Sequence, residues 1–365
     1  MKGFRLGKIL GIELVIDASW LIIAALITFS LFVEFSDATS ASGAIAWAAA
    51  GATSFLFFGS VLVHELSHSV VAKARGLVVR RIRLFIFGGV SEIENEAPTP
   101  GDEFAITIAG PASSLVMAGV FALIALPLEG PLERMFGLLA FVNLALGLFN
   151  LLPGFPLDGG RLLRSAVWKA TGDFARGTRV AVFMGKLLAG LLAMAGLFVM
   201  VAQGQVAGLW YVAIAWFLYQ AADSALVYMQ SQHILSGATA GQVMSPTPVA
   251  VAAEMSVEEL HDKHLLGGRS ATFPVVSDGR VRGLVALEHA AAIPSSDWPA
   301  VTVGQIMTSL GPNDVVAADA LVEGLLDEFQ GRRRRLAVVS EGRIAGVLTE
   351  VDVARFIRRA EANTG

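Results

Sequence analysis

The sequence of 365 residues contains no cysteine. This absence excludes disulfides, Cys-liganded zinc sites, iron–sulfur clusters and thiol catalysis, so any transition-metal site must use the six histidines and the carboxylates. Charge is also scarce. An ordinary soluble domain has about a quarter charged residues, whereas only 16% are charged here, 55% are hydrophobic and the mean hydropathy is +0.64. These values predict a membrane protein, and a net charge of -4 gives no reason to expect a nucleic-acid partner.

The few charges are unevenly distributed along the chain. Residues 1–235 contain 15 Lys or Arg and 15 Asp or Glu, whereas residues 236–365 contain 12 and 16. A composition shift of this kind indicates a domain boundary. We predict a transmembrane domain over residues 1–230, a linker over residues 231–238 and a soluble C-terminal part.

Six segments are apolar enough to be membrane spans, which need about 20 mostly apolar residues. They lie near residues 19–32, 42–64, 104–126, 135–152, 180–201 and 209–228. Basic residues gather before the first span and after the second and fourth spans, whereas Arg134 is the only basic residue in the opposite loops. The positive-inside rule therefore predicts a multi-pass protein of the cell membrane with both termini in the cytosol. The N-terminus also has features of a signal peptide, but the later spans favour an uncleaved first helix.

The most informative segment is His64-Glu-Leu-Ser-His68, within the second span. On a helix, two histidines four residues apart project from one face and can chelate one ion, with Glu65 beside them to take a proton from water. Two histidines satisfied by hydrogen bonds in a helix bundle are the alternative, but two His and a Glu near membrane depth are costly without a function.

A catalytic zinc usually takes three protein ligands, so a third must come from elsewhere. The remaining histidines lie at or beyond the end of the last span, which makes Asp158 the best candidate. It follows the fourth span in a segment broken by Pro153, Pro156, Gly159 and Gly160. Irregular backbone at membrane depth needs protein or a water-filled cavity around it. A loop aspartate that caps the next helix is the alternative.

These motifs resemble the site-2 protease family of intramembrane zinc metalloproteases. The resemblance covers residues 1–230 and includes Phe87–Gly89 and Gly110-Pro111. It implies one catalytic Zn²⁺ bound by His64, His68 and Asp158, with Glu65 as catalytic base. It also implies that Asn150 lies near the active site and holds the substrate strand or its oxyanion. The substrate would be a membrane-anchored protein.

Residues 78–94 predict a β-hairpin, in which Arg81 and Arg83 alternate with Ile82, Leu84 and Ile86, and Gly88-Gly89 forms the turn. A substrate helix must unwind before it is cleaved, and its extended segment could pair with a strand of this hairpin. A purely structural hairpin at the membrane surface is the alternative.

The soluble part contains an internal repeat with a displacement of 63 residues. Three segments return: 241–244 as 304–307, 273–276 as 336–339, and 279–285 as 342–348. The pattern resembles a tandem pair of CBS domains, over residues 239–292 and 302–360. Such pairs often dimerise, which makes a homodimer a further expectation.

Many CBS pairs bind ATP or another adenine nucleotide. Their signature resembles residues 346–352, where Asp352 would hold ribose hydroxyls and Thr349 a phosphate. Ala286 and His289 occupy the matching positions of the first repeat, so we expect one nucleotide site rather than two. A structural or dimerising pair is the alternative.

The predicted fold class is an α-helical polytopic membrane protein, with six transmembrane helices and a small membrane-associated β-hairpin, followed by an α/β tandem CBS pair. The predicted function is regulated intramembrane proteolysis by a zinc metalloprotease, under nucleotide control. A transporter or channel gated by CBS domains is the alternative. The scarcity of other charged groups in the spans and the lack of an inverted repeat count against it.

Overall fold

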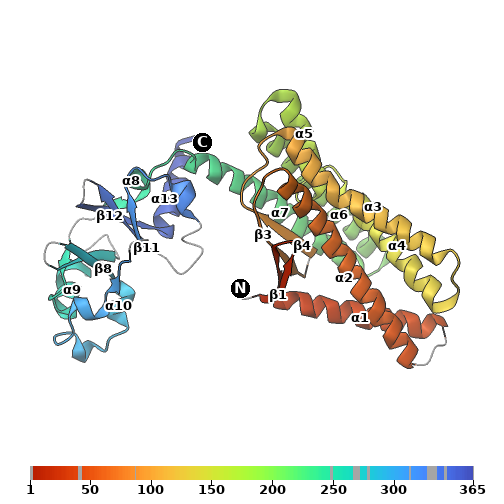
Figure 1. Ribbon diagram of the computed structural model, residues 1–365, viewed down its shortest axis with the longest axis horizontal. Coiled ribbons are helices and arrows are strands. Elements are labelled where there is room, and N and C mark those ends of the chain that lie inside the picture. Colours follow the sequence, from red (N-terminus) through yellow and green to blue (C-terminus); the bar gives the residue numbers. More distant parts are fainter. Residues whose placement is uncertain are drawn as a thin grey trace. The chain divides into compact units, whose positions relative to one another are not determined.

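The computed structural model describes residues 3–39, 43–86, 88–246, 250–265, 272–277, 280–311, 314–326, 335–340 and 343–364. The chain divides into two compact units, Met1–Val227 and Tyr228–Gly365. Helices dominate the first unit, and small sheets with short helices make up most of the second (Figure 1). The two units are described separately.

Six long helices form the framework of the first unit and confirm the six predicted spans. Each contains a segment long and apolar enough to cross a membrane. Several of their large apolar side chains are exposed, among them Phe29, Leu123 and Trp216, as expected for surfaces that meet lipid rather than water. The helices are α1 (Ala18–Thr39), α2 (Gly43–Ala74), α3 (Pro100–Ala125), α4 (Gly130–Asn150), α6 (Phe174–Gln203) and α7 (Gly208–Leu235).

Local signals set several helix ends. Thr99 caps α3 by accepting a hydrogen bond from the Asp102 backbone, and Pro100 occupies the first turn, where its missing N–H costs nothing. Asp173 caps α6 in the same way through Arg176. A shorter helix, α5 (Asp158–Thr171), ends at Gly172, which adopts the left-handed conformation that favours glycine.

A four-stranded sheet packs beside α2 and is larger than the predicted hairpin. Its order is β1 (Phe4–Ile9), β2 (Ile12–Ile16), β3 (Val79–Phe85) and β4 (Gly88–Ile93). The outer pairs are antiparallel, whereas β2 and β3 are parallel and are joined through α1 and α2. The N-terminal strands were not predicted. The predicted alternation is confirmed within β3, because Ile82 and Leu84 are buried and Arg81 and Arg83 are not. It does not extend to Ile86, which is exposed after the end of the strand.

The predicted turn of the hairpin is wrong. Gly88 and Gly89 already belong to β4, where they pair with Phe85 and Leu84. The connection comprises Ile86 and Phe87, and Phe87 lies outside the described residues. The reason for a glycine at position 89 is not the turn but a close approach to α2, described below.

The buried core of this region lies between the sheet and the helices. Ile12, Leu14, Ile82 and Leu84 pack from the sheet against α2 and α3. A second cluster joins α1, α2, α3 and α4 near their other ends, around Phe35, Phe121 and Leu139. Figure 1 shows α2, α3 and α4 as neighbouring long rods with β3 and β4 beside α2. The sheet therefore sits along the half of α2 that carries His64 and His68.

The second unit contains two copies of one motif, and the 63-residue displacement holds for its strands. Strands β7 (Thr272–Ser277) and β8 (Arg280–Ala286) correspond to β11 (Arg335–Ser340) and β12 (Arg343–Thr349). Each repeat adds a strand to the sheet of the other, because β5 (Ser245–Pro246) pairs with β12 and β9 (Thr308–Ser309) pairs with β8. The other strands and α-helices in the described part of this unit are α8 (Ala240–Val243), β6 (Val251–Ala252), α9 (Val257–Leu260), α10 (Leu287–Ala291), α11 (Val303–Ile306), β10 (Val315–Ala317) and α13 (Glu350–Thr364).

Candidate metal centre

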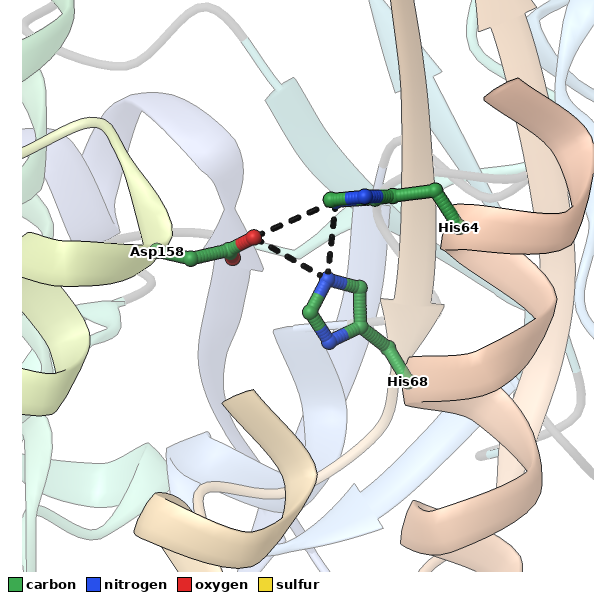
Figure 2. A group of neighbouring side chains, drawn as sticks. All are labelled: His64, His68 and Asp158. Carbon is green, nitrogen blue, oxygen red and sulfur yellow. Dashed lines mark hydrogen bonds and ion pairs between the residues drawn. The ribbon is translucent and has the colours of Figure 1, made fainter. Parts of the chain in front are cut away.

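His64, His68 and Asp158 converge on one point. The two histidines are buried and lie one turn apart on α2, and Asp158 is the first residue of α5. The Nε2 atoms of His64 and His68 are 3.3 Å apart, and each lies 3.2 Å from Oδ2 of Asp158 (Figure 2). Among the residues that the structure describes, these three form the only group of three or more His, Asp or Glu ligand atoms gathered closely enough to hold a metal ion.

The spacing of these three atoms fits a tetrahedral ion. Ligand distances of about 2.0–2.1 Å place the donor atoms of a tetrahedral zinc site about 3.3–3.4 Å apart. The three observed separations of 3.2–3.3 Å match three vertices of such a tetrahedron. The donor set of two imidazoles and a carboxylate is one that catalytic zinc sites use, and it leaves the fourth vertex open.

The outer nitrogens of both imidazoles have partners that orient the rings. Nδ1 of His68 donates to the Ile106 carbonyl at 2.8 Å, so its Nε2 carries the lone pair that faces the cluster. Nδ1 of His64 lies 2.9 Å from the Ser114 hydroxyl. Partners of this kind fix the tautomer and strengthen a ligand. Lone pairs that converge with a carboxylate repel one another unless a cation lies between them.

Asp158 does not cap a helix. Leu157 occupies the cap position of α5 without a side-chain hydrogen bond, and the Asp158 carboxylate points to the histidines. The carboxyl of an aspartate has an ordinary pKa of about 3.9 and loses its proton well below neutral pH. The group is therefore ionised, which is the form that binds a cation.

A buried ion pair holds α5 in place. Nε of Arg164 donates to Oε1 of Glu103 on α3 at 2.7 Å, and both side chains are buried. The guanidinium also lies over the rings of Phe155 and Phe174, at 5.2 and 4.5 Å from their centroids. Removing one partner of a buried pair typically costs about 3–5 kcal/mol. Glu103 and Arg164 therefore fix the helix whose first residue is Asp158.

Glu65 and Asn150 line the same cavity as the three converging residues. The cavity has a volume of about 470 Å³. Asn150, at the end of α4, lies in its wall together with Arg161 and the start of β4. Oε2 of Glu65 accepts a hydrogen bond from the Ser91 hydroxyl at 3.0 Å. The structure thus brings all five residues predicted for the catalytic site to one cavity.

Gly110 on α3 lies against the two imidazoles. A Cβ built at this position would lie 2.7 Å from Nε2 of His64 and would also overlap Nε2 and Cε1 of His68. Only glycine leaves room here, because α3 passes the converging nitrogens at backbone distance. Gly110 was noted in the sequence only through the family resemblance, and Ser91, Ser114, Glu103 and Arg164 were not singled out for the site.

Thr349 and Asp352 lie together at the start of α13. Oδ2 of Asp352 accepts hydrogen bonds from the Thr349 backbone N–H at 3.0 Å and from its hydroxyl at 2.6 Å, in the pattern of a helix cap. Oδ1 accepts from the Ser245 hydroxyl at 2.6 Å and from Arg355 at 3.2 Å. In the first repeat, His289 takes the position of Asp352 and lies 3.4 Å from the Thr308 hydroxyl.

Family models match both parts of the chain. The model for peptidase family M50 matches residues 52–131 and 127–193, and the CBS domain model matches residues 240–293 and 303–359. A protein of Synechocystis sp. that carries the name zinc metalloprotease, sll0528, is 34% identical over 99% of this chain and 97% of its own length. The chain belongs to peptidase family M50, the site-2 proteases.

Two further relatives match the chain, one over most of its length and one over part of it. Zinc metalloprotease Rip3 of Mycobacterium tuberculosis is 34% identical over 96% of this chain and 92% of its own length. A solved site-2 protease from Methanocaldococcus jannaschii is 29% identical, covers 62% of this chain and 95% of its own, and has a TM-score of 0.45. The M50 protein described here is thus a multi-pass zinc metalloprotease with a CBS pair, and the transporter alternative is set aside.

Proposed function

We propose that this M50 protein is an intramembrane endopeptidase that hydrolyses peptide bonds in or near the transmembrane segments of membrane-anchored proteins. The observation that carries the proposal is the convergence of His64, His68 and Asp158 in a cavity that also contains Glu65. The three converging residues would hold the zinc ion.

Each residue of the cavity has a role in the proposed reaction. Zinc, when bound, supplies Lewis-acid polarisation of the scissile carbonyl and activates water. Glu65 accepts the proton of the attacking water and passes it to the leaving amine nitrogen. Asn150 has an amide that can donate to the substrate carbonyl or hold the substrate backbone. Ser114 and Ile106 keep the imidazoles oriented throughout.

The edge of β4 is the proposed binding site for the unwound substrate. Strand β4 comes last in the order β1-β2-β3-β4, so one of its edges has no strand partner among the described residues. Gly88, Gly89, Val90 and Ser91 line the cavity wall. An extended peptide can add to such an edge through main-chain hydrogen bonds. Because these bonds do not involve side chains, the edge can bind substrates of many sequences. This would bring a scissile bond beside Glu65.

The proposed orientation places the N-terminus and the CBS pair in the cytosol. It is supported by the basic residues at the ends of the spans, including Lys73 and Arg75 at the end of α2 and Arg176 at the start of α6. Cavity-lining residues such as Asp158 and Arg161 belong to α5, which follows α4 on that same side. Water and the substrate segment would then enter from the cytosolic half of the membrane.

Metal removal tests the proposed activity. We expect the purified full chain in lipid vesicles to contain about one zinc per chain. It should cleave a single-span test protein whose transmembrane segment contains glycine and asparagine. Treatment with 1,10-phenanthroline should abolish cleavage, and added zinc should restore it, because the three protein ligands remain in place. Zinc content is measured by atomic emission and cleavage by gel mobility.

The non-chelating isomer 1,7-phenanthroline serves as the control and should leave cleavage unchanged. Cleavage that persists after the zinc has been removed would contradict a metalloprotease mechanism. Absence of cleavage by the zinc-loaded chain would contradict the proposed substrate class.

Adenine nucleotide binding at the second CBS repeat is the proposed regulatory input. Asp352 offers a carboxylate to ribose hydroxyls, and Thr349 lies beside it. Asp352 accepts hydrogen bonds from Ser245, Arg355 and Thr349. Binding would therefore require these contacts to be exchanged for contacts with the nucleotide. In the first repeat, His289 and Ala286 replace the two residues, and an imidazole offers at most one acceptor to a ribose.

Paired substitutions test this asymmetry. We expect ATP or AMP to bind the full chain at one site, and Asp352→Ala to weaken that binding about tenfold or more, because hydrogen bonds to a charged group are lost. His289→Ala, at the equivalent position 63 residues earlier, is the matched control and should leave affinity unchanged. Calorimetric titration measures affinity, and thermal melting checks that loss of the cap has not unfolded the repeat. Equal affinities in both variants would rule out Asp352 as the ribose ligand.

A further inference from the structure

Two consecutive inward-facing positions of β4 contact the side chain of Glu65. Alternate residues of a strand face the same side, so Gly89 and Ser91 both face α2. A Cβ at Gly89 would lie 3.0 Å from Cδ of Glu65 and would overlap Cγ. The hydroxyl of Ser91 lies 3.0 Å from Oε2 of the same carboxylate. One strand therefore meets both the stem and the head of the Glu65 side chain.

Ser69 on α2 adjoins the contact between Ser91 and Glu65. Ser69 lies one turn after Glu65 on α2 and is fully buried. Its hydroxyl lies 3.1 Å from the Ser91 oxygen and 3.0 Å from the Glu65 carbonyl. The Ser91 hydroxyl has a second acceptor within reach, the Glu65 carbonyl at 3.2 Å, and its shorter contact is with Oε2. A carboxylate only accepts hydrogen bonds, so Ser91 is the donor in its contact with Oε2.

This arrangement separates the roles of the two oxygens of Glu65. Oε2 is held by Ser91, whereas Oε1 receives no hydrogen bond from the described part of the chain. Each carboxylate oxygen can accept two hydrogen bonds, so Oε1 keeps both of its acceptor sites. Misplacement of a catalytic group by about 1 Å can cost on the order of 100-fold in rate. The hydrogen bond from Ser91 to Oε2 therefore restricts the rotation of the carboxylate and with it the direction of Oε1.

We propose that Ser91 is a positioning residue for Glu65, and that it couples the substrate-binding edge of β4 to the base. The inference rests on the proposed function, since it assigns a role to Ser91 in that reaction. Backbone groups of β4 bind the extended substrate, while side chains of the same strand hold Glu65. Docking of a substrate strand, which rigidifies β4, thereby also fixes the carboxylate that acts on it.

A purely structural role for Ser91 makes a different prediction. If the Ser91 hydroxyl only stabilised the packing of β4 on α2, it would affect the position of the substrate-binding edge. Loss of the hydroxyl would then raise KM or lower the stability of the protein. A hydroxyl that aims the base is used in the chemical step, so its loss lowers kcat and leaves KM and zinc content unchanged. The separation of kcat from KM therefore distinguishes the two roles.

The test uses the full chain in vesicles and the single-span test protein described above. We expect Ser91→Ala to lower kcat about 10- to 100-fold, with KM, zinc content and melting temperature unchanged. Ser91→Thr keeps the hydroxyl and suits a strand, so it should restore kcat to within about threefold of the wild type. Ser67→Ala is the matched control, because the Ser67 hydroxyl bonds only the Val63 carbonyl of its own helix.

The outcomes separate this inference from the function on which it rests. If the wild type cleaves and Glu65→Gln does not, an unchanged kcat in Ser91→Ala overturns the positioning role alone. A raised KM with unchanged kcat, loss of zinc in Ser91→Ala, or failure of threonine to restore kcat also overturns it. If the wild type does not cleave, or Glu65→Gln still does, the proposed function fails and the role of Ser91 falls with it.

Discussion

Glu65→Gln is expected to lower kcat for cleavage about 10²- to 10⁴-fold, which is the usual contribution of a general base. The amide has the size of the carboxylate and can still bond the Ser91 hydroxyl, but it cannot accept the proton of the attacking water. Zinc content should remain at the wild-type value, because the converging ligand atoms belong to His64, His68 and Asp158. Loss of activity without loss of metal is the signature of a missing base.

Glu92→Gln provides the control for this change. Glu92 is on the opposite face of β4, where it pairs with Arg81 and Arg83, and it is not part of the cavity wall. The same chemical substitution there should leave cleavage within about twofold of the wild type, as exposed ion pairs contribute little. Cleavage rates with zinc analysis check both variants. A Glu65→Gln protein that cleaves at the wild-type rate would remove Glu65 from the mechanism.

Gly110→Ala is expected to remove the zinc ion and with it all cleavage. The new methyl group would stand 2.7 Å from Nε2 of His64 and closer still to the ring of His68. The rings cannot withdraw freely, because their outer nitrogens are bonded to Ser114 and Ile106. Displacing ligand nitrogens weakens zinc binding by at least the 10- to 100-fold that loss of an outer partner costs, as an order of magnitude.

Gly119→Ala on the same helix is the matched control. No atom lies within 4 Å of a Cβ built at Gly119. Alanine in a helix is intrinsically favoured over glycine by about 1 kcal/mol, so this variant should keep zinc and activity and melt no lower than the wild type. Zinc analysis, cleavage and thermal melting of both variants measure the contrast. A Gly110→Ala chain that binds zinc as tightly as the wild type would contradict the observed packing.

The spans and their order could be predicted from the sequence because hydropathy reports directly on burial in lipid. The duplication in the second unit could also be predicted from the sequence, and its 63-residue displacement recurs in the strands. The two N-terminal strands were missed for a physical reason. They join the larger sheet only where β2 pairs with β3 across α1 and α2. The side chains of β1 are all exposed, so no alternation of buried and exposed residues marks this strand.

The residues of the site could be predicted where the chemistry of metal binding requires a particular residue type. They could not be predicted where the role of a residue depends only on which segments approach each other in the fold. His64 and His68 could be selected because two histidines four residues apart in an apolar helix are costly without a function. Asp158 could be selected because the remaining histidines lie at or beyond the last span. Ser91 is an ordinary residue of a strand, and only the approach of β4 to α2 gives it a partner on Glu65. Gly89 was interpreted as a turn residue because turns are the commonest use of paired glycines. Its actual use depends on a contact between segments that are distant in sequence.

The parallel pairing of β2 and β3 also determines the order in which the protein can mature during synthesis. Residues 17–78 lie between the two strands and include both α1 and α2. At about 5–20 residues per second, roughly 3 to 12 seconds separate the synthesis of β2 from that of β3. Until then β1 and β2 form a lone hairpin, which is marginally stable by itself. Ser91 reaches Glu65 only after the first two helices have entered the bilayer, and Asp158 follows two helices later. The set of His64, His68, Asp158 and the Ser91 contact to Glu65 is therefore incomplete until α5 has been synthesised.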